Sequence, residues 1–504
     1  ATPLTDLNAL YARQEEVETL SANKNLREGL RDKLKTTPDI ERALARLTVG
    51  RGKPKDLGII RDGLSSAENI YTISNQTSES ALENTVGLIQ QNSKQQKLIN
   101  LFENSLEEDL PFLERDGGLI KEGYNSKLDE LRTLRDNSKR HIAALQAKYR
   151  ELSGIDTLKV SHNNVLGFFI DVTARHADKL MIKNGEPNQD LGSDNPFIHR
   201  QTLANNVRFT TPELSELERD LASAADKAIA IEVELFNDFV TQVCALSDDI
   251  GRTAQGLAAL DVALSMATLA VEQNYTKPTL DNSTTFIIEE GRHPVVEDAL
   301  SKQSESFIPN DCNLSQAQRL WLLTGPNMAG KSTFLRQNAL IAILAQIGSF
   351  VPAKAAHIGV IDRLFSRVGA ADDLARGQST FMVEMVETAA ILNQATERSL
   401  VILDEIGRGT ATFDGLSIAW SCVEQLHEIT KCRSLFATHY HELTSLQKRL
   451  NALRCYSLQV KEWKGDIVFM HTVKEGTADQ SYGIHVAKLA GLPGNVVARA
   501  KEIL

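Results

Sequence analysis

The segment LWLLTGPNMAGKSTFL (320–335) restricts the possible folds of this chain more than any other feature. An apolar run ends at Gly325, and GKS (330–332) precedes a second apolar stretch. Glycines let backbone N–H groups converge on a phosphate, and the N-terminus of a following helix favours negative charge. The segment therefore predicts a strand, a phosphate-binding loop and a helix, which is the arrangement of a P-loop nucleotide-binding domain.

The loop satisfies the pattern G-x-x-x-x-G-K-S from Gly325 to Ser332. Lys331 is predicted to reach the β- and γ-phosphates of a nucleoside triphosphate, and the Ser332 hydroxyl is predicted to ligate Mg²⁺. The other predicted nucleotide contacts of the loop are Gly325, Pro326, Met328, Ala329, Gly330 and Thr333.

A second segment, LVILDE (400–405), supplies the acidic half of such a site. Its four apolar residues predict a buried strand that ends at Asp404, where Mg²⁺ would be held, and Glu405 can orient and deprotonate the attacking water. His439 ends a third β-rich run, SLFATH, and could polarise the γ-phosphate; a structural role is the alternative. These residues predict ATP hydrolysis, with Glu405, His439 and Lys331 as catalytic groups and with ATP and Mg²⁺ as cofactors.

Length and composition describe an ordinary soluble protein of several domains. The chain has 504 residues, 42% hydrophobic and 24% charged, and no apolar run approaches the roughly 20 residues of a membrane span. The N-terminus lacks the layout of a signal peptide. Five cysteines without a C-x-x-C pair argue against structural zinc and disulfides and predict a cytosolic protein. The net charge of −11 argues against a surface coated for nucleic acid but does not exclude a local binding face.

Two long helical stretches, which start near Leu119 and Leu214, have apolar residues at the spacing of a single buried stripe. Each is about 30 residues, or roughly 45–50 Å, long, and Thr211-Pro212-Glu213 predicts the start of the second. Between them, 158–173 alternates like a β-hairpin, and the polar segment 183–196 is predicted to be a surface loop. We interpret the pattern as an antiparallel helical arm that carries a small β-rich head; an ordinary helical bundle is the alternative.

The two ends of the chain differ in secondary structure. Residues 1–110 are predicted to be mostly helical, with a loop at 50–58. After about residue 273, the runs FIIEEG, LWLLTG, LVILDE, SLFATH and IVFMHTV predict strands of a largely parallel or mixed sheet flanked by helices. Two short terminal helices, Val486 to Leu489 and Val496 to Leu504, are separated by Gly491-Leu492-Pro493.

Several motifs in a fixed order carry a resemblance to a known family. TGPNMAGKST, 369–385, 404–415, ATHYHEL and 478–493 together resemble the MutS family of DNA mismatch-repair ATPases, and TPLTDL and 197–218 extend the resemblance over essentially the whole chain. The resemblance implies an α+β multidomain fold. Its parts are a helical core (1–118), a lever helix (119–152), a clamp (153–211), a returning lever helix and core (212–272), an ABC-like α/β ATPase domain (273–478) and a helix-turn-helix dimerisation segment (479–504).

The resemblance also implies roles for single residues. ATPases of this family are dimers in which the partner subunit completes each site, so Ser379 would face the γ-phosphate bound by the other subunit. Asn327 would contact the nucleotide. Phe307 and Ile308 match an adenine-stacking pair, and His471 would close the base pocket; for Phe307, a core position is the alternative reading.

In the family, the helices are levers and the β-rich head is a clamp that closes on duplex DNA. Asn163 and Asn205 match polar positions near phosphate, although residues 153–211 hold six Lys/Arg and six Asp/Glu, so composition lends no support. Phosphate contacts through amides and backbone N–H groups are physically reasonable. The implied partners are mismatched double-stranded DNA, a MutL-type repair partner and a second copy of the chain, without a membrane, in a nucleoid-associated protein of the bacterial cytosol.

One part of the family pattern has no match. Nothing in the chain resembles the mismatch-reading domain or its connector, so we expect a piece of a longer protein; a paralogue acting on recombination or replication intermediates is the alternative. An SMC-like ATPase is disfavoured because its arm separates the P-loop from the acidic strand. A clamp that binds ATP without hydrolysis is disfavoured because a binding-only site needs no base such as Glu405.

Overall fold

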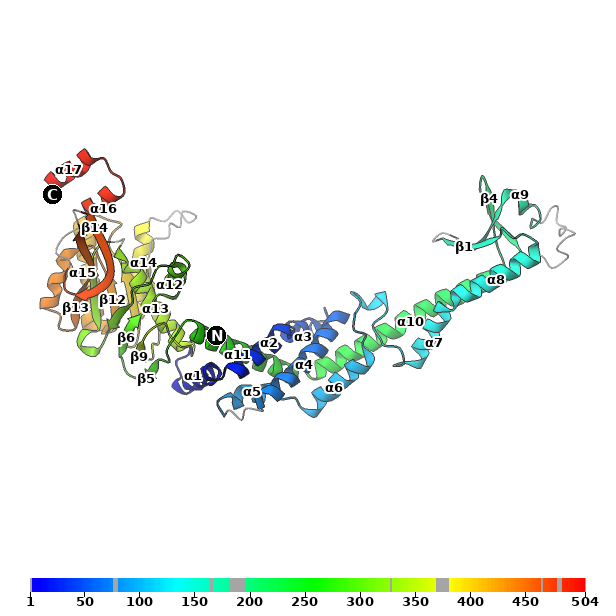
Figure 1. Cartoon of the computed structure of the whole chain (residues 1–504), viewed down its shortest axis with the longest axis horizontal. Helices are drawn as coiled ribbons and strands as arrows, with labels where there is room; N and C mark the ends of the chain where they lie inside the picture. Colours follow the sequence, from blue (N-terminus) through cyan, green and yellow to red (C-terminus); the bar gives the residue numbers. More distant parts are fainter. Residues whose placement is uncertain are drawn as a thin grey trace. The chain divides into compact units, whose positions relative to one another are not determined.

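The computed structural model describes residues 2–75, 80–163, 166–181, 196–326, 329–368, 380–463, 466–477 and 483–503 (Figure 1). The chain divides into two compact units. One unit contains Ala1–Asp32, Ile73–Val86 and Ala258–Leu504, and the other contains Lys33–Thr72 and Gly87–Leu257. Both helix and sheet are present, as an α+β multidomain protein requires.

The first hundred residues are helical, as the sequence predicts. The helices are α1 (Leu7–Ala22), α2 (Lys24–Thr36), α3 (Ile40–Thr48), α4 (Pro54–Asn75), α5 (Glu83–Ile89) and α6 (Ser93–Ser105), with short 3-10 turns at Ser80–Leu82 and Glu114–Asp116. The predicted loop at 50–58 is too long, because α4 already starts at Pro54. Proline suits the first helical position, where its missing N–H would have no helical partner.

The second predicted long helix is confirmed as α10 (Pro212–Ala245). The Thr211 side chain accepts a hydrogen bond from Leu214 N at 3.0 Å, and Pro212 occupies the first turn, as the sequence predicts. Figure 1 shows α7 (Ser126–Asp136) and α8 (Ser138–Ser153) lying beside α10. Ion pairs Arg132–Glu232 and Lys148–Glu213 fix the direction of these helices as antiparallel to α10. The helical arm is therefore present.

The first arm helix starts later than predicted. The apolar spacing suggests a start at Leu119, but α7 begins at Ser126. Gly117, Gly118 and Gly123 have positive φ angles of 73°, 82° and 88°, which a right-handed helix does not allow. Ile120 instead forms a β-bridge with Leu106. The glycine-rich turn thus interrupts a periodic apolar pattern.

The head at the end of the arm is a four-stranded antiparallel sheet of order β1-β2-β4-β3. Its elements are β1 (Lys159–Asn163), β2 (Gly167–Thr173), the short helix α9 (Ala174–Ala177), β3 (Ile198–Thr202) and β4 (Asn206–Thr210). The predicted hairpin is confirmed as β1–β2. Buried Tyr149, Phe197, Phe209 and Leu214 form part of the core that joins this sheet to the arm helices.

Helix α11 (Ser247–Glu272) follows α10 in the chain. In length and composition it could cross a membrane, although no unbroken apolar run suggested it. Half of its most apolar window is buried inside the protein, and Leu260, Leu264 and Ala267 are almost fully buried at three- and four-residue spacing. This stripe identifies α11 as a core helix.

The C-terminal half contains two sheets among the described residues. The six-stranded sheet has the order β10-β11-β12-β8-β13-β14, with β14 antiparallel to β13 and the other neighbours parallel. Its strands are β8 (Leu320–Thr324), β10 (Leu364–Arg367), β11 (Leu400–Asp404), β12 (Arg433–Ala437), β13 (Leu453–Trp463) and β14 (Asp466–Glu475). The four-stranded sheet has the order β5-β9-β6-β7, made of β5 (Thr279–Asp281), β9 (Ala355–Gly359), β6 (Phe286–Gly291) and β7 (Asn310–Asn313).

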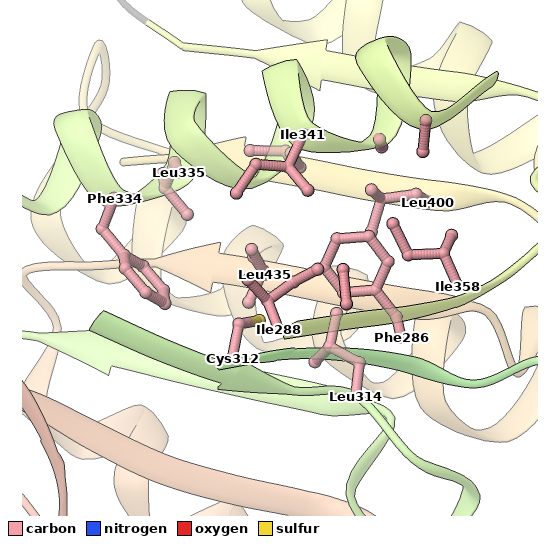
Figure 2. Close-up of a cluster of buried hydrophobic side chains, with 14 of the residues drawn as sticks. Phe286, Ile288, Cys312, Leu314, Phe334, Leu335, Ile341, Ile358, Leu400 and Leu435 are labelled. Carbon is pink, nitrogen blue, oxygen red and sulfur yellow. The ribbon is translucent and has the colours of Figure 1, made fainter. Parts of the chain in front are cut away.

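All five predicted runs are strands, but FIIEEG is β6 and belongs to the smaller sheet. Helix α13 (Lys331–Gln346) packs its apolar side chains on strands of both sheets (Figure 2). The cluster drawn there includes Phe286, Cys312, Phe334, Ile341 and Leu435. This packing fixes the N-terminus of α13 at the carboxyl end of β8.

The remaining helices of this half are α12 (Pro294–Ser301), α14 (Thr380–Gln394), α15 (Thr412–Glu424), α16 (Gly483–Leu489) and α17 (Gly494–Ile503). A π-helical turn spans Gln425–Thr430, and 3-10 turns span Gln316–Gln318 and His441–Lys448. The predicted pair of terminal helices is confirmed as α16 and α17.

Candidate nucleotide-binding site

The loop between β8 and α13 has the backbone of a phosphate-binding turn. Gly325 and Gly330 have φ angles of 123° and 105°, in a region that L side chains rarely adopt. An added Cβ at either glycine would meet nothing closer than 3.5 Å, so the conformation, rather than lack of space, requires glycine. The helix starts directly after Gly330 and directs its free N–H groups at the loop.

Lys331 lies inside this turn and is only 1% exposed. Its ammonium donates a hydrogen bond to the carbonyl of Gly325 and lies 3.9 Å from Glu405 Oε1. Burial lowers the pKa of Lys331, against the opposite effect of Glu405 and Asp404. A positive charge held in this way can attract a phosphate group.

Ser332 and Asp404 meet where the sequence places a magnesium ion. Ser332 Oγ donates a hydrogen bond to Asp404 Oδ2 at 2.7 Å, while Asp404 Oδ1 is buried and has no partner among the residues that the structure describes. Burial raises the pKa of Asp404, the hydrogen bond from Ser332 lowers it and the nearby Glu405 raises it. A divalent cation would satisfy the free oxygen and stabilise the ionised carboxylate.

The two protein groups, Ser332 and Asp404, suit Mg²⁺ better than a metal ion that is bound entirely by protein side chains. Within the described ranges there is no group of three or more His, Cys, Asp or Glu side chains that could hold a metal ion. Mg²⁺ in phosphate-transfer sites is bound by one or two protein groups together with phosphate oxygens and waters. Ser332 and Asp404 fit that pattern.

Glu405 follows β11 and has a strained backbone. Its φ angle is 58°, and its N–H donates to the carbonyl of Ala437, the last residue of β12, at 2.9 Å. The carboxylate is mostly buried and contacts the guanidinium of Arg408. Left-handed conformations of non-glycine residues cost about 1–2 kcal/mol and concentrate at functional sites. The strained backbone directs a carboxylate towards Lys331.

His439 lies two residues after β12, beside this carboxylate. Desolvation lowers the pKa of His439, while the charge of Glu405 raises it. The ring packs against Tyr440 with centroids 4.1 Å apart. Because the net shift is downward, the imidazole is neutral around pH 7 and can donate or accept a hydrogen bond.

A cavity of about 300 Å³ adjoins the loop. Its lining includes Gly330 and Thr333, at the start of α13, and Phe307, Ile308 and His471, which come from two other segments of the chain. His471 has a φ angle of 52°, and its Nδ1 lies 2.9 Å from the carbonyl of Ala329. Phe307 is half-buried at the wall of this cavity, so the alternative reading as a core aromatic is wrong.

Asn310 was not predicted as part of the site. Its amide donates to the carbonyls of Ile308 at 3.2 Å and His471 at 2.9 Å, and its oxygen accepts from Val473 N at 2.7 Å. The side chain therefore joins β7 to β14 and holds two walls of the cavity. In the sequence, the position of Asn310 directly after Phe307-Ile308-Pro309 could have indicated that it belongs to the site. Gln337, on α13, also lines the cavity and was also missed.

Some predicted residues are not placed in this site. Asn327, Met328 and Ser379 lie outside the described residues. Asn163 and Asn205 lie in the β-rich head: Asn163 Oδ1 accepts from Leu166 N at 2.7 Å, and exposed Asn205 accepts at its carbonyl from Ala174 N. Asn163 is the last residue of β1, and Asn205 lies in the turn between β3 and β4.

The fold and the site define a P-loop nucleotide-binding protein. A family model for MutS domain V matches residues 321–504, and one for MutS family domain IV matches residues 123–227. The chain belongs to the MutS family, and the predicted family resemblance is confirmed. Proteins of this family are ATPases, and the domain V match supports that activity.

The similar relatives include proteins described as DNA mismatch repair protein MutS. Those of Rhodopseudomonas palustris strain BisB18 and Rhizobium meliloti strain 1021 are each 56% identical to this chain over 509 residues. That of Nitrobacter hamburgensis is 54% identical over 509 residues. Each match covers 100% of this chain and 55% of the relative, so the chain spans about half the length of the curated relatives it matches.

Proposed function

We propose that this chain binds and hydrolyses ATP with Mg²⁺ and uses the nucleotide to control a DNA-encircling clamp in mismatch repair. One observation carries the enzymatic part. Lys331, Ser332, Asp404 and Glu405 come from two distant segments and meet at the carboxyl edge of one sheet. A binding-only site would not need the strained carboxylate of Glu405.

Each group has a defined task in this proposal. Lys331 and the N–H groups of the loop bind the phosphates; Ser332 and Asp404 would hold Mg²⁺, whose positive charge would offset that of the phosphate oxygens. Glu405 accepts a proton from the attacking water, with its carboxylate oriented by Arg408. Neutral His439 orients the water or the terminal phosphate. Phe307, Ile308 and His471 enclose the base.

The clamp part of the proposal is supported by the arm and by the relatives' printed names. α10 has 34 residues and hence a length of about 50 Å, so small rotations at one end would become large displacements at the other. In this proposal, the arm helices are levers, the β-rich head contacts DNA through Asn163 and Asn205, and α16–α17 support dimerisation. Ser379 of the partner subunit would complete each ATP site.

The proposed partners follow from the family. They are mismatched double-stranded DNA, a MutL-type repair protein and a second copy of this chain, in the bacterial cytoplasm. The matches to MutS domains IV and V do not favour an SMC-like ATPase. These matches do not distinguish a mismatch-repair protein from a related paralogue. The relatives are described as DNA mismatch repair proteins, which favours the first.

Glu405→Gln tests the enzymatic part. The variant should bind ATP and Mg²⁺ but hydrolyse ATP about 10²–10⁴ times more slowly, because only the proton acceptor is removed. Phosphate release and nucleotide titration measure the two properties separately. Glu397→Gln, at an exposed position in the turn before β11, is the matched control and should hydrolyse normally. Normal turnover in Glu405→Gln would exclude Glu405 as the base.

A further inference from the structure

The turn that follows Glu405 is held by side chains from two other segments of the chain. Gly407 N donates a hydrogen bond to Glu384 Oε1 at 2.6 Å, and the Tyr440 hydroxyl donates to the Gly407 carbonyl at 3.0 Å. Glu384 lies on α14 and is 7% exposed, and Tyr440 follows β12 and is 5% exposed. Both backbone groups of Gly407 are therefore bonded to buried side chains.

Close backbone packing leaves this turn little freedom. Gly407 has a φ angle of 88°, and an added Cβ there would lie 2.4 Å from the carbonyl oxygen of Gly415, in the first turn of α15. An added Cβ on Gly409 would lie 2.9 Å from Cβ of Phe381, in the first turn of α14. Glycine allows both approaches because it has no side chain. The turn thus lies directly against α14 and α15.

These contacts fix Glu405 from both sides. On its N-terminal side, its own N–H is bonded to Ala437 O at 2.9 Å. On its C-terminal side, Ile406 is fully buried and Gly407 is bonded to Glu384. A non-glycine residue keeps a left-handed backbone only where its surroundings impose that conformation. A carboxylate accepts hydrogen bonds that are about twice as strong as those between neutral groups, which suits Glu384 to this task.

We infer that Glu384 is a positioning residue for ATP hydrolysis: its carboxylate holds Gly407 and thereby keeps Glu405 directed at the attacking water. The inference rests on the proposed ATPase function and adds to it a residue that does not line the base cavity. Tyr440 supports the same turn from the carbonyl side of Gly407. Burial raises the pKa of Tyr440, and the negative charge of Glu384 raises it further, so the hydroxyl keeps its proton and donates it to the carbonyl.

Two substitutions separate the reach of the Glu384 side chain from its charge. Glu384→Asp keeps the charge, but its carboxylate is one methylene too short to reach Gly407 N. Its kcat should fall about tenfold or more while its Kd for ATP stays within about twofold, because a misplaced base slows turnover without weakening phosphate binding. Glu384→Gln keeps the length and an oxygen acceptor, so its kcat should stay within about threefold of that of the unaltered protein. Phosphate release at saturating ATP gives kcat, and equilibrium titration gives Kd.

Glu387→Asp is the matched control on the same helix. Glu387 is exposed and pairs with Arg367, the last residue of β10, at 2.8 Å. This variant should hydrolyse ATP normally. Glu384→Met, which removes the acceptor without leaving a short carboxylate in a buried place, should lose as much turnover as Glu384→Asp, and it serves as the test if the aspartate variant does not fold.

A double variant shows whether Glu384 acts through Glu405. Glu384→Asp combined with Glu405→Gln should turn over no more slowly than Glu405→Gln alone, because both changes disable the same base and their effects should not add. A role of Glu384 in stability alone would add its own loss to that of Glu405→Gln.

Four results would overturn the inference. They are normal kcat in Glu384→Asp and Glu384→Met, equal losses in Glu384→Asp and Glu384→Gln, a fall in ATP affinity that matches the fall in kcat, and additive losses in the double variant. Absence of ATP hydrolysis by the unaltered protein would remove the proposed ATPase function together with the positioning role. That result needs no variant and is thereby distinguished from the other four.

Discussion

At the residue scale, two side chains proposed to act at the nucleotide site have left-handed backbones: Glu405 with φ 58° and His471 with φ 52°. Each conformation costs about 1–2 kcal/mol. Neighbouring strands hold both residues, since Glu405 N donates to Ala437 O and His471 O accepts from Asn310. The bond at Glu405 joins two backbone groups, whereas the bond at His471 comes from the Asn310 side chain and can be removed by substitution.

Asn310→Asp removes one such bond. Aspartate cannot donate to Ile308 and His471, and its charge would face their carbonyl oxygens, so the cavity walls should separate. We expect ATP affinity to fall at least about tenfold, with little change for inorganic triphosphate. Asn313→Asp is the control on the same strand, because Asn313 only accepts, from Ser315 N. Equal ATP affinities in the two variants would show that Asn310 does not organise the cavity.

At the scale of elements, local chemistry predicted more than periodicity did. Thr211-Pro212-Glu213 gave the start of α10 correctly because capping depends on adjacent residues. The start of α7 was wrong because Leu119 and Ile120 are fully buried without being helical, so their apolar character continued the helical pattern. The spacing of apolar residues indicates which positions are buried, and a buried turn can continue that spacing just as a helix can.

The local sequence pattern also could not predict which strands pair with one another. The five β-rich runs are strands, but nothing within FIIEEG (286–291) indicates that β6 pairs with β7 and β9 rather than with β8, β11 or β12 of the larger sheet. The P-loop and the acidic strand end were predictable because their chemistry is contained in a few adjacent residues. Asn310 was not, because its role depends on neighbours from distant segments.

Glu232 gives a prediction for the arm. This 3% exposed carboxylate, within the buried stripe of α10, accepts from Gly118 N, Leu119 N and the Arg132 guanidinium. Glu232→Ala would leave a guanidinium and two N–H groups without partners, and should lower the free energy of unfolding by about 3 kcal/mol in urea titrations.

The control for that measurement is Glu213→Ala. Glu213 pairs with Lys148 at 2.8 Å, but both side chains are about half exposed, so the loss should stay below about 1 kcal/mol. Similar costs for the two variants would mean that the buried carboxylate does not anchor the glycine turn to α10.

At the scale of the whole molecule, the proposed coupling between ATP and DNA must be reciprocal. If ATP changes the affinity for duplex DNA by some factor, DNA changes the affinity for ATP by the same factor. The nucleotide site and the β-rich head belong to different compact units of the chain. The head can therefore be removed without altering any residue of the nucleotide site, which separates DNA binding from hydrolysis.

The arm shows where to make the deletion. Tyr149 Oη lies 2.7 Å from Thr211 Oγ1, so the ends of α8 and α10 are adjacent, and a short glycine linker can replace residues 155–210. This variant should lose duplex binding and keep basal ATP hydrolysis, and duplex should no longer change its ATP affinity. Binding must be compared at one salt concentration, because phosphate contacts weaken steeply with salt. Duplex binding as tight as that of the parent would exclude the head as the clamp, whereas loss of hydrolysis alone would point to coupling through the arm.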